Sequence, residues 1–379
     1  MSHDRWNAIT DLAPDPGGGG GPLAGVRVGV KSNIAVAGLP HTGGMAHLAG
    51  NIAPRDAEVV ARLRGAGASI IGTLNMHEAA LGATTDNAFY GRTHNPHHHG
   101  YTPGGSSGGS GAAVAAGLVD LALGTDTLGS VRIPAAYCGV YGLKPTHGAV
   151  SSDGLIFLDA RFDCIGPLAR DLAMIERAWD VIGNGGAVGP LPRLIVLDDL
   201  AGVRCEPAVM AGYVAALLAL GEPQAVLKLP AGTTDIRMAA LAGTVRALIH
   251  DLGPHRAQAS EELRFILSAL ENIPENHGLL AEVKAGLEDA LRDDGVLLMP
   301  TAPQAAFPHG GRAPASQADF TGLANIAGLP AIALPSGWTA DGLPVSVQLV
   351  GPAGSERRLI ALARRLDGAL NQYRPPKGE

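Results

Sequence analysis

Charged residues are scarce in this sequence. They make up only 17% of the 379 residues, below the usual quarter, and this composition excludes disorder driven by charge. The formal net charge is −7 and no basic stretch is present, which argues against nucleic acid as a partner. Only five residues are lysines, so a lysine beside a buried strand is worth examining as a functional group.

Cysteines and long apolar runs are also few. Cys138, Cys164 and Cys205 are odd in number and widely spaced, which fits neither a disulfide framework nor the paired ligands of a zinc site. No apolar run reaches about 18 residues without glycine, proline or charge, so we expect no membrane span and no membrane partner. The polar N-terminus has no signal-peptide core. These features predict a protein of the reducing cytoplasm.

Glycine, in contrast, is abundant, with 53 residues, about twice the usual share. The cluster at 17–21 is typical of a flexible linker, and we expect 1–21 to form a flexible, Gly-rich N-terminal tail. The clusters at 104–111 and 124–142 lie within apolar sequence, where glycine usually permits close backbone approach or a positive φ.

Strand patterns and helix patterns alternate along the chain. Strands are predicted at 26–30, 69–72, 119–124, 194–197, 296–299, 331–334 and 345–350. Helices are predicted at 54–67, 108–118, 170–182, 206–220, 235–252, 260–271, 278–292 and 355–370. This interleaving indicates an α/β fold with a largely parallel or mixed sheet.

The most distinctive segment is GGSSGGSG at 104–111, which admits three interpretations. A flexible linker is disfavoured because Pro103 and an apolar helix flank the segment. A phosphate loop is disfavoured because alanines follow, where that motif needs lysine and then serine or threonine. A nucleophile elbow, G-x-S-x-G, fits around Ser106, although 95–103 is no apolar strand. An esterase of the α/β-hydrolase type that uses Ser106 remains an alternative, since His and Asp residues follow.

A second serine segment begins as a strand and runs into a glycine-containing turn that ends on Ser130. Consecutive backbone N–H groups in such a turn can point toward one centre. These groups would form an oxyanion hole around a serine nucleophile. The N–H groups concerned belong to Thr127, Leu128, Gly129 and Ser130.

Lys31 is the candidate base for this serine. It ends an apolar strand, where loss of hydration would lower the pKa of the lysine and leave a neutral amine. An ordinary surface charge is the other interpretation of a lysine after a strand. No S-x-x-K motif occurs in the chain, which excludes the β-lactamase arrangement.

The order and spacing of these segments resemble the amidase signature family. The matching stretches include GVRVGVKSNIAVAGLPHTGG at 25–44, TPGGSSGGSGAAVAAGL at 102–118, ALGTDTLGSVRIPAAYCGVYGLKPTHGAVS at 122–151, GVLLMPTAP at 295–303 and NIAGLPAIALPSGWTADGLPVSVQLVG at 325–351. The resemblance implies one domain over 22–373, with a tail at 374–379. Its fold would be an α/β/α sandwich with a central mixed β-sheet covered by helices on both faces.

The resemblance also implies a Ser–Ser–Lys triad that hydrolyses amides without a cofactor. Ser130 would form the acyl-enzyme and Lys31 would be the base. Ser106, preceded by a cis peptide bond, would relay the proton between them. Further positions that match the family and would support the site are Gly104, Gly105, Ser107, Asp126 and Arg132. We expect the last two to pair, although an ordinary buried ion pair would have the same residues.

Two departures from the family pattern bear on activity. Leu128 stands where the family has glycine or alanine, so its side chain would crowd the oxyanion turn or line the acyl pocket. The chain is also shorter than typical members over about 184–294, where the family builds much of its substrate pocket. We therefore expect a small or open pocket. No carboxylate-binding arginine follows from a motif, and the candidates are Arg161, Arg246 and Arg312.

The histidines do not form a metal-site pattern. The run at 97–99, with His94 nearby, has adjacent side chains that point in different directions, and no carboxylate stands beside it. The sequence HEAAL at 77–81 lacks the second histidine of H-E-x-x-H, because Leu81 replaces it. We expect no metal and a solvated histidine loop near the pocket mouth.

The principal hypothesis is an amidase that cleaves a small carboxamide or urea-like compound and releases ammonia or an amine, as a monomer or a homodimer. A second is a component like the A subunit of the tRNA-dependent amidotransferase that needs partner chains; the short middle region and negative charge disfavour a role facing tRNA. The esterase using Ser106 is a third. An inactive homologue, suggested by Leu128, is a fourth.

Overall fold

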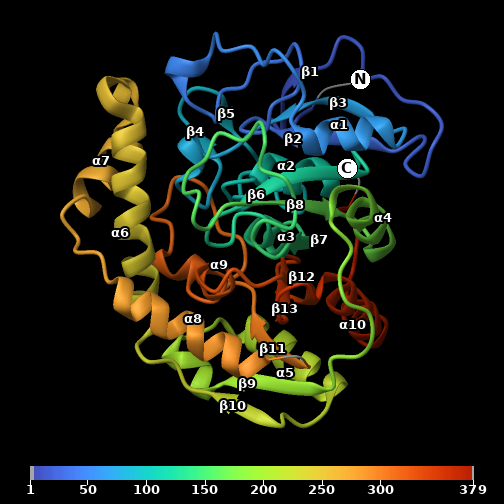
Figure 1. Cartoon of the computed structure of the whole chain (residues 1–379), viewed down its shortest axis with the longest axis vertical. Coiled ribbons are helices and arrows are strands. Elements are labelled where there is room, and N and C mark those ends of the chain that lie inside the picture. The colour runs from blue at the N-terminus through green and yellow to red at the C-terminus, as the bar shows by residue number, and fades with distance from the viewer. Residues whose placement is uncertain (1–3, 293, 378–379) are drawn as a thin grey trace.

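The computed structural model describes residues 4–292 and 294–377, and one β-sheet runs through its centre (Figure 1). The strands of this sheet are β1 (Ile9–Leu12), β2 (Arg27–Lys31), β3 (Ser69–Leu74), β6 (Leu121–Asp126), β7 (Tyr141–Lys144), β8 (Cys164–Ala169), β9 (Arg193–Leu197), β10 (Ala225–Leu227), β11 (Gly295–Pro300), β12 (Ala331–Trp338) and β13 (Pro344–Val350). A separate two-stranded sheet pairs β4 (Asp86–Asn87) with β5 (Gly91–Arg92).

The sheet is mixed, with the 11 strands in the order β1-β3-β2-β6-β8-β7-β12-β13-β11-β9-β10. Parallel pairing joins β2 to β3 and β6, and joins β9 to β10 and β11. The strands from β6 across to β11 pair antiparallel. Lys31, the last residue of β2, and Asp126, the last residue of β6, therefore reach the same edge of the sheet.

Helices cover both faces of the sheet. They are α1 (Glu58–Gly65), α2 (Gly108–Ala115), α3 (Arg132–Tyr137), α4 (Leu172–Ile182), α5 (Pro207–Leu220), α6 (Thr233–Leu252), α7 (Glu261–Leu270), α8 (His277–Leu291), α9 (Gly322–Ile326) and α10 (Glu356–Leu370). In β6, Leu121 and Leu123 pack in one core cluster with Trp179 of α4, whereas Ala122 packs in another with Ala112 of α2. Successive strand residues point to opposite faces, so α4 and α2 lie on opposite sides. The expected α/β/α sandwich is confirmed.

Most predicted elements are present and shifted by only a few residues. The helix predicted at 170–182 is α4, and its first turn is capped by Asp171, whose Oδ1 accepts the Met174 N–H at 2.7 Å. The helix predicted at 54–67 begins later, at Glu58, where α1 starts. Among the helices of residues 4–292 and 294–377, none is long and apolar enough to cross a membrane.

The expectation of a flexible tail over 1–21 is wrong for the part that forms β1. Ile9 lies opposite Leu74 in antiparallel pairing with β3, so this segment is the edge strand of the sheet. Farther along, the Pro16 carbonyl accepts the Ile70 N–H at 2.8 Å. Backbone pairing thus holds a glycine-rich segment whose composition alone suggested mobility; residues 1–3 lie outside the description. The boundaries 22–373 and 374–379 remain predictions.

A comparison of two helical glycines tests how tightly α2 packs beneath the sheet edge. A Cβ at Gly109 of α2 would lie 2.3 Å from the Asn75 carbonyl oxygen, whereas a Cβ at Gly286 of α8 has no atom within 4 Å. We expect Gly109→Ala to lower the free energy of unfolding by about 2 kcal/mol or more, because backbone must move. Gly286→Ala should leave it unchanged or raise it by up to about 1 kcal/mol. Urea unfolding of both variants measures this, and equal midpoints would contradict the packing described.

Candidate active site

Lys31 lies fully buried at the end of β2. Its Nζ donates hydrogen bonds to Ser106 Oγ at 2.7 Å and to Thr125 Oγ1 at 2.6 Å. Burial lowers the pKa of Lys31 to about 7, although the negative charges of Asp163 and Asp126 oppose this shift. Near neutral pH a large share of this amine is therefore unprotonated and able to accept a proton.

The glycine–serine loop brings Ser106 to this lysine. The Gly105–Ser106 peptide bond is cis, as the resemblance implied. Gly104 has φ of +84°, and a Cβ on it would lie 3.0 Å from the Pro134 backbone. A Cβ on Gly105 would lie 2.8 Å from the Thr84 nitrogen. The loop therefore fits here only with glycine at both positions.

Ser107 ties the loop to the end of β6. Its Oγ donates to the Thr125 carbonyl at 3.1 Å and accepts the Thr125 N–H at 3.2 Å. Its backbone N–H donates to the Ser130 carbonyl at 3.3 Å. One residue thus connects the loop of Ser106 to both the strand and the turn that carries Ser130.

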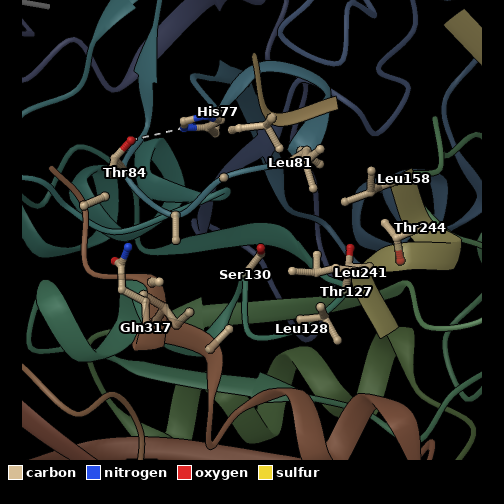
Figure 2. Close-up of a pocket in the computed structure, with 18 of the residues that line it drawn as sticks. His77, Leu81, Thr84, Thr127, Leu128, Ser130, Leu158, Leu241, Thr244 and Gln317 are labelled. Carbon is tan, nitrogen blue, oxygen red and sulfur yellow. Dashed lines mark hydrogen bonds between the residues drawn. The ribbon is translucent and has the colours of Figure 1, made fainter. Parts of the chain in front are cut away.

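Ser130 lies between β6 and α3, on the wall of a cavity of about 350 Å³. Its hydroxyl points into this cavity (Figure 2), and within the described residues it makes no hydrogen bond. Ser106, in contrast, is fully buried behind the wall. A substrate in the cavity therefore meets the Ser130 hydroxyl, while Ser106 contacts Lys31.

The turn at 127–130 does not leave all four backbone amides available. Asp126 Oδ1 accepts the Gly129 N–H at 2.7 Å, so Gly129 is removed from the expected oxyanion hole. In the part of the chain that the structure describes, the N–H groups of Thr127, Leu128 and Ser130 have no hydrogen-bond partner. Three of the four predicted donors therefore remain available to an oxyanion.

Side chains from distant segments fix this turn. Thr127 Oγ1 donates to Asp163 Oδ1 at 2.5 Å, and Thr321 Oγ1 donates to the Leu128 carbonyl at 2.6 Å. Burial raises the pKa of Asp163 to about 6, although the hydrogen bonds that its carboxylate accepts oppose this shift. The turn is thus held from both sides before any substrate binds.

Asp126 and Arg132 form a fully buried, bidentate ion pair. Arg132 Nη2 lies 2.9 Å from Asp126 Oδ1, and its Nε donates to Oδ2 at 3.0 Å. Asn325 and Gln348 accept further bonds from this guanidinium, at 2.6 and 2.7 Å. Burial alone would raise the pKa of Asp126, but the charge and hydrogen bond of Arg132 lower it to about 2. The carboxylate therefore stays ionised and keeps its bonds to the turn.

The cavity is lined by several segments that converge from different parts of the chain. Helices α6 and α7, which stand together at one side of the molecule in Figure 1, supply much of the wall. The lining residues used below are His77, Thr84, Thr127, Leu128, Ser130, Leu158, Arg237, Leu241, Glu262 and Gln317. At about 350 Å³ the cavity is at the lower end of the range of roughly 300–1,000 Å³ for ligand sites.

None of the three candidate arginines lines this cavity. Arg161 pairs with Asp159 and Arg246 with Glu275, while Arg312 borders a neighbouring hollow. The sequence analysis missed Arg237, which does line the cavity, and also Thr125 and Asp163. Of these three residues, Thr125 could have been found from the sequence, because it is a polar residue directly after the strand predicted at 119–124.

The histidine run lies away from the cavity. His97 Nε2 lies 3.0 Å from the Cys138 carbonyl oxygen, and His98 and His99 are exposed. Within the described residues, no group of three His, Cys, Asp or Glu side chains is arranged to hold a metal ion. His77, which sequence analysis placed in a broken zinc motif, does line the cavity, with Nδ1 at 3.2 Å from Thr84 Oγ1.

Comparison with known proteins agrees with this geometry. The sequence pattern of the family described as Amidase matches residues 7–184 and 271–360, and so leaves out α6 and α7. The A subunit of the glutamyl-tRNA(Gln) amidotransferase of Methanospirillum hungatei is 34% identical over 417 residues, which cover 95% of this chain and 96% of that relative.

Solved structures show the same similarity. A chain from a vestigial protein complex, described as revealing the evolutionary origins of an s-triazine catabolic enzyme, has a TM-score of 0.88 at 29% identity, covering 99% of this chain and 93% of that one. The peptide amidase PAM, in complex with the inhibitor chymostatin, has a TM-score of 0.80 at 26% identity, covering 100% and 92%. The chain belongs to the amidase signature family.

Proposed function

We propose that this protein hydrolyses the C–N bond of a small carboxamide or urea-like compound through an acyl-enzyme on Ser130. One observation carries the proposal: the buried amine of Lys31 lies 2.7 Å from Ser106 Oγ, and the next residue, Ser107, donates its backbone N–H to the carbonyl of Ser130, which lines the cavity. Membership of the amidase family supports cleavage of amide bonds in general.

The first half of the reaction uses the three side chains in series. Neutral Lys31 accepts the proton of Ser106 while Ser106 accepts the proton of Ser130. Ser130 Oγ attacks the carbonyl carbon, and the free backbone N–H groups of the turn stabilise the oxyanion. The proton returns through Ser106 to the leaving nitrogen, the C–N bond breaks, and ammonia or an amine departs.

The second half repeats the relay with water. Water gives its proton through Ser106 to Lys31 and attacks the acyl carbon, and the ester bond to Ser130 then breaks with return of that proton. The products are a carboxylic acid and free enzyme. In this scheme Asp126 and Arg132 position the turn, and Ser107 positions the loop. None of these three residues exchanges a proton with the substrate.

The burial of Ser106 disfavours the esterase alternative. An α/β-hydrolase nucleophile stands exposed at a strand-to-helix turn. Ser106 is fully buried with its Oγ on Lys31, and the hydroxyl that faces the cavity belongs to Ser130.

A second candidate function is that of an amidotransferase A-like component. It is favoured by the relatives, since the A subunits of Methanospirillum hungatei and Thermus thermophilus are 34% and 36% identical to this chain. Such a component would hydrolyse an amide only beside partner chains. An amidase would turn over amides as the isolated chain. Light scattering of that isolated chain would also distinguish a monomer from a homodimer.

Substitution of the three side chains tests the proposed roles. We expect Ser130→Ala, Ser106→Ala and Lys31→Met each to lower kcat by about 10³-fold or more, because each interrupts one relay. The matched control is Ser110→Ala, a buried serine of the adjoining helix α2 whose Oγ donates to the Leu123 carbonyl. Ammonia release measures the rates, and a serine-reactive phosphonofluoridate should label Ser130. Label on Ser106 with full activity in Ser130→Ala would establish the esterase instead.

The pH dependence tests Lys31 as the base. Its pKa is lowered to about 7, so acidification below 7 protonates the amine, and kcat/KM should fall up to tenfold per pH unit. The negative charge of Asp163 raises the pKa of Lys31, so Asp163→Asn should move this acid limb to lower pH. A rate that is constant from pH 8 to below pH 6 would be incompatible with this base.

A further inference from the structure

The cavity has an apolar side and a polar side, with Ser130 between them. Figure 2 shows Leu128, Leu158 and Leu241 on one side of Ser130, and Thr84 and Gln317 on the other. Thr127 and Thr244 also lie among the leucines, but their hydroxyls donate to Asp163 and Asp159 within the protein. Three separate segments form the apolar side: the turn at 127–130, the loop that carries Leu158, and α6. Helix α6 lies outside the residues that the family pattern matches, so that pattern does not define this part of the wall.

Leu128 is fixed next to the reacting centre. Its carbonyl is held by Thr321 Oγ1 at 2.6 Å, and the residue before it is held through Asp163. Its own N–H is one of the three donors left for the oxyanion. The Leu128 side chain therefore stands beside the position of the substrate carbonyl.

The charged groups that face the cavity offer little to a charged substrate. Arg237 Nε already donates to Asp319 Oδ1 at 2.6 Å, and both side chains are nearly buried, so this pair is neutral overall. Burial, opposed in part by Asp86, lowers the pKa of His77 to about 4, so its ring is uncharged at pH 7.

Glu262 is the remaining charged group and lies half-exposed in the wall. Burial raises its pKa, as do the charges of Asp86 and Glu78. Its carboxylate lies 3.9 Å from His77 Nε2 and would repel a substrate carboxylate. Leu128, Leu158 and Leu241 offer no partner to a charged group of either sign, so such a group would lose its hydration there. Glutamine, with a carboxylate and an ammonium on its acyl chain, fits this wall poorly.

We infer that the substrate is a neutral primary amide with a hydrocarbon acyl group, and that Leu128 and Leu241 determine this specificity. The inference rests on the proposed function and names its substrate class. The hydrocarbon lies against the apolar wall, the carbonyl oxygen at the turn, and the leaving ammonia departs on the side of Thr84 and Gln317.

Matched amides test this inference. 5-Methylhexanamide ends in an isopropyl group, and glutaramate has the same shape but ends in a carboxylate. Heptanamide ends in a methyl group, and 6-aminohexanamide has the same length but ends in an ammonium group. We expect kcat/KM to rise about fourfold per methylene from acetamide to hexanamide, from about 0.8 kcal/mol per buried methylene. The neutral member of each pair should be preferred by tenfold or more. Preference for either charged member, or for N-hexylacetamide over hexanamide, would overturn the inference.

Two variants locate the effect. Leu128→Ala should flatten the chain-length dependence, and Leu241→Asn should reduce the preference for 5-methylhexanamide by tenfold or more. Leu218→Asn is the control, because Leu218 is 78% exposed on α5, outside the cavity. Unchanged preference in both cavity variants would contradict the assignment of these leucines.

Binding separates this inference from the proposed function. Calorimetry with Ser130→Ala, which retains the cavity, compares Kd for 5-methylhexanamide and glutaramate without turnover. Tighter binding of the neutral amide supports the substrate class even if the wild type releases no ammonia, a result that would count against the proposed function alone. Equal or tighter binding of glutaramate overturns the substrate class whatever the rates.

Discussion

The hydrogen bond between Lys31 Nζ and Ser106 Oγ is the interaction on which the site depends. An ammonium group in a fully buried position is costly, so the protein environment shifts this amine toward its neutral form. The sheet makes this possible, because parallel β2 and β6 end at the same edge and place Lys31 beside Thr125. Because Lys31 ends a buried strand, its pKa is lowered, as the proposed role of base requires.

The second constraint is steric and is met by glycine. Gly104 and Gly105 allow the loop to pass so close to Pro134 and Thr84 that a Cβ would not fit. The Ser107 hydroxyl then forms hydrogen bonds with both the carbonyl and the N–H of Thr125, near the end of β6. The proposed base, relay and nucleophile come from three segments, and their relative positions depend on these close backbone approaches rather than on flexible side chains.

Much of this arrangement could be predicted from the sequence, because the relevant patterns are local. The apolar run before Lys31, the glycine–serine loop and the turn at Ser130 each carry their own signal. Strands β7 and β8 were not predicted, because glycine interrupts the first, and glycine and proline interrupt the second. Asp163 and Arg237 were missed because they reach the site only through tertiary packing. Gly129 was misassigned because its N–H bonds to Asp126, a geometry that spacing does not determine.

Direct titration of Lys31 tests the central claim. The chain has five lysines, so NMR of lysine labelled at Cε gives few signals, and the one absent from Lys31→Met is Lys31. Lys144 is also buried and has a lowered pKa, which makes this assignment essential. The structure predicts that the Lys31 signal titrates near pH 7. Titration near 10.4, the ordinary value for lysine, would contradict the account.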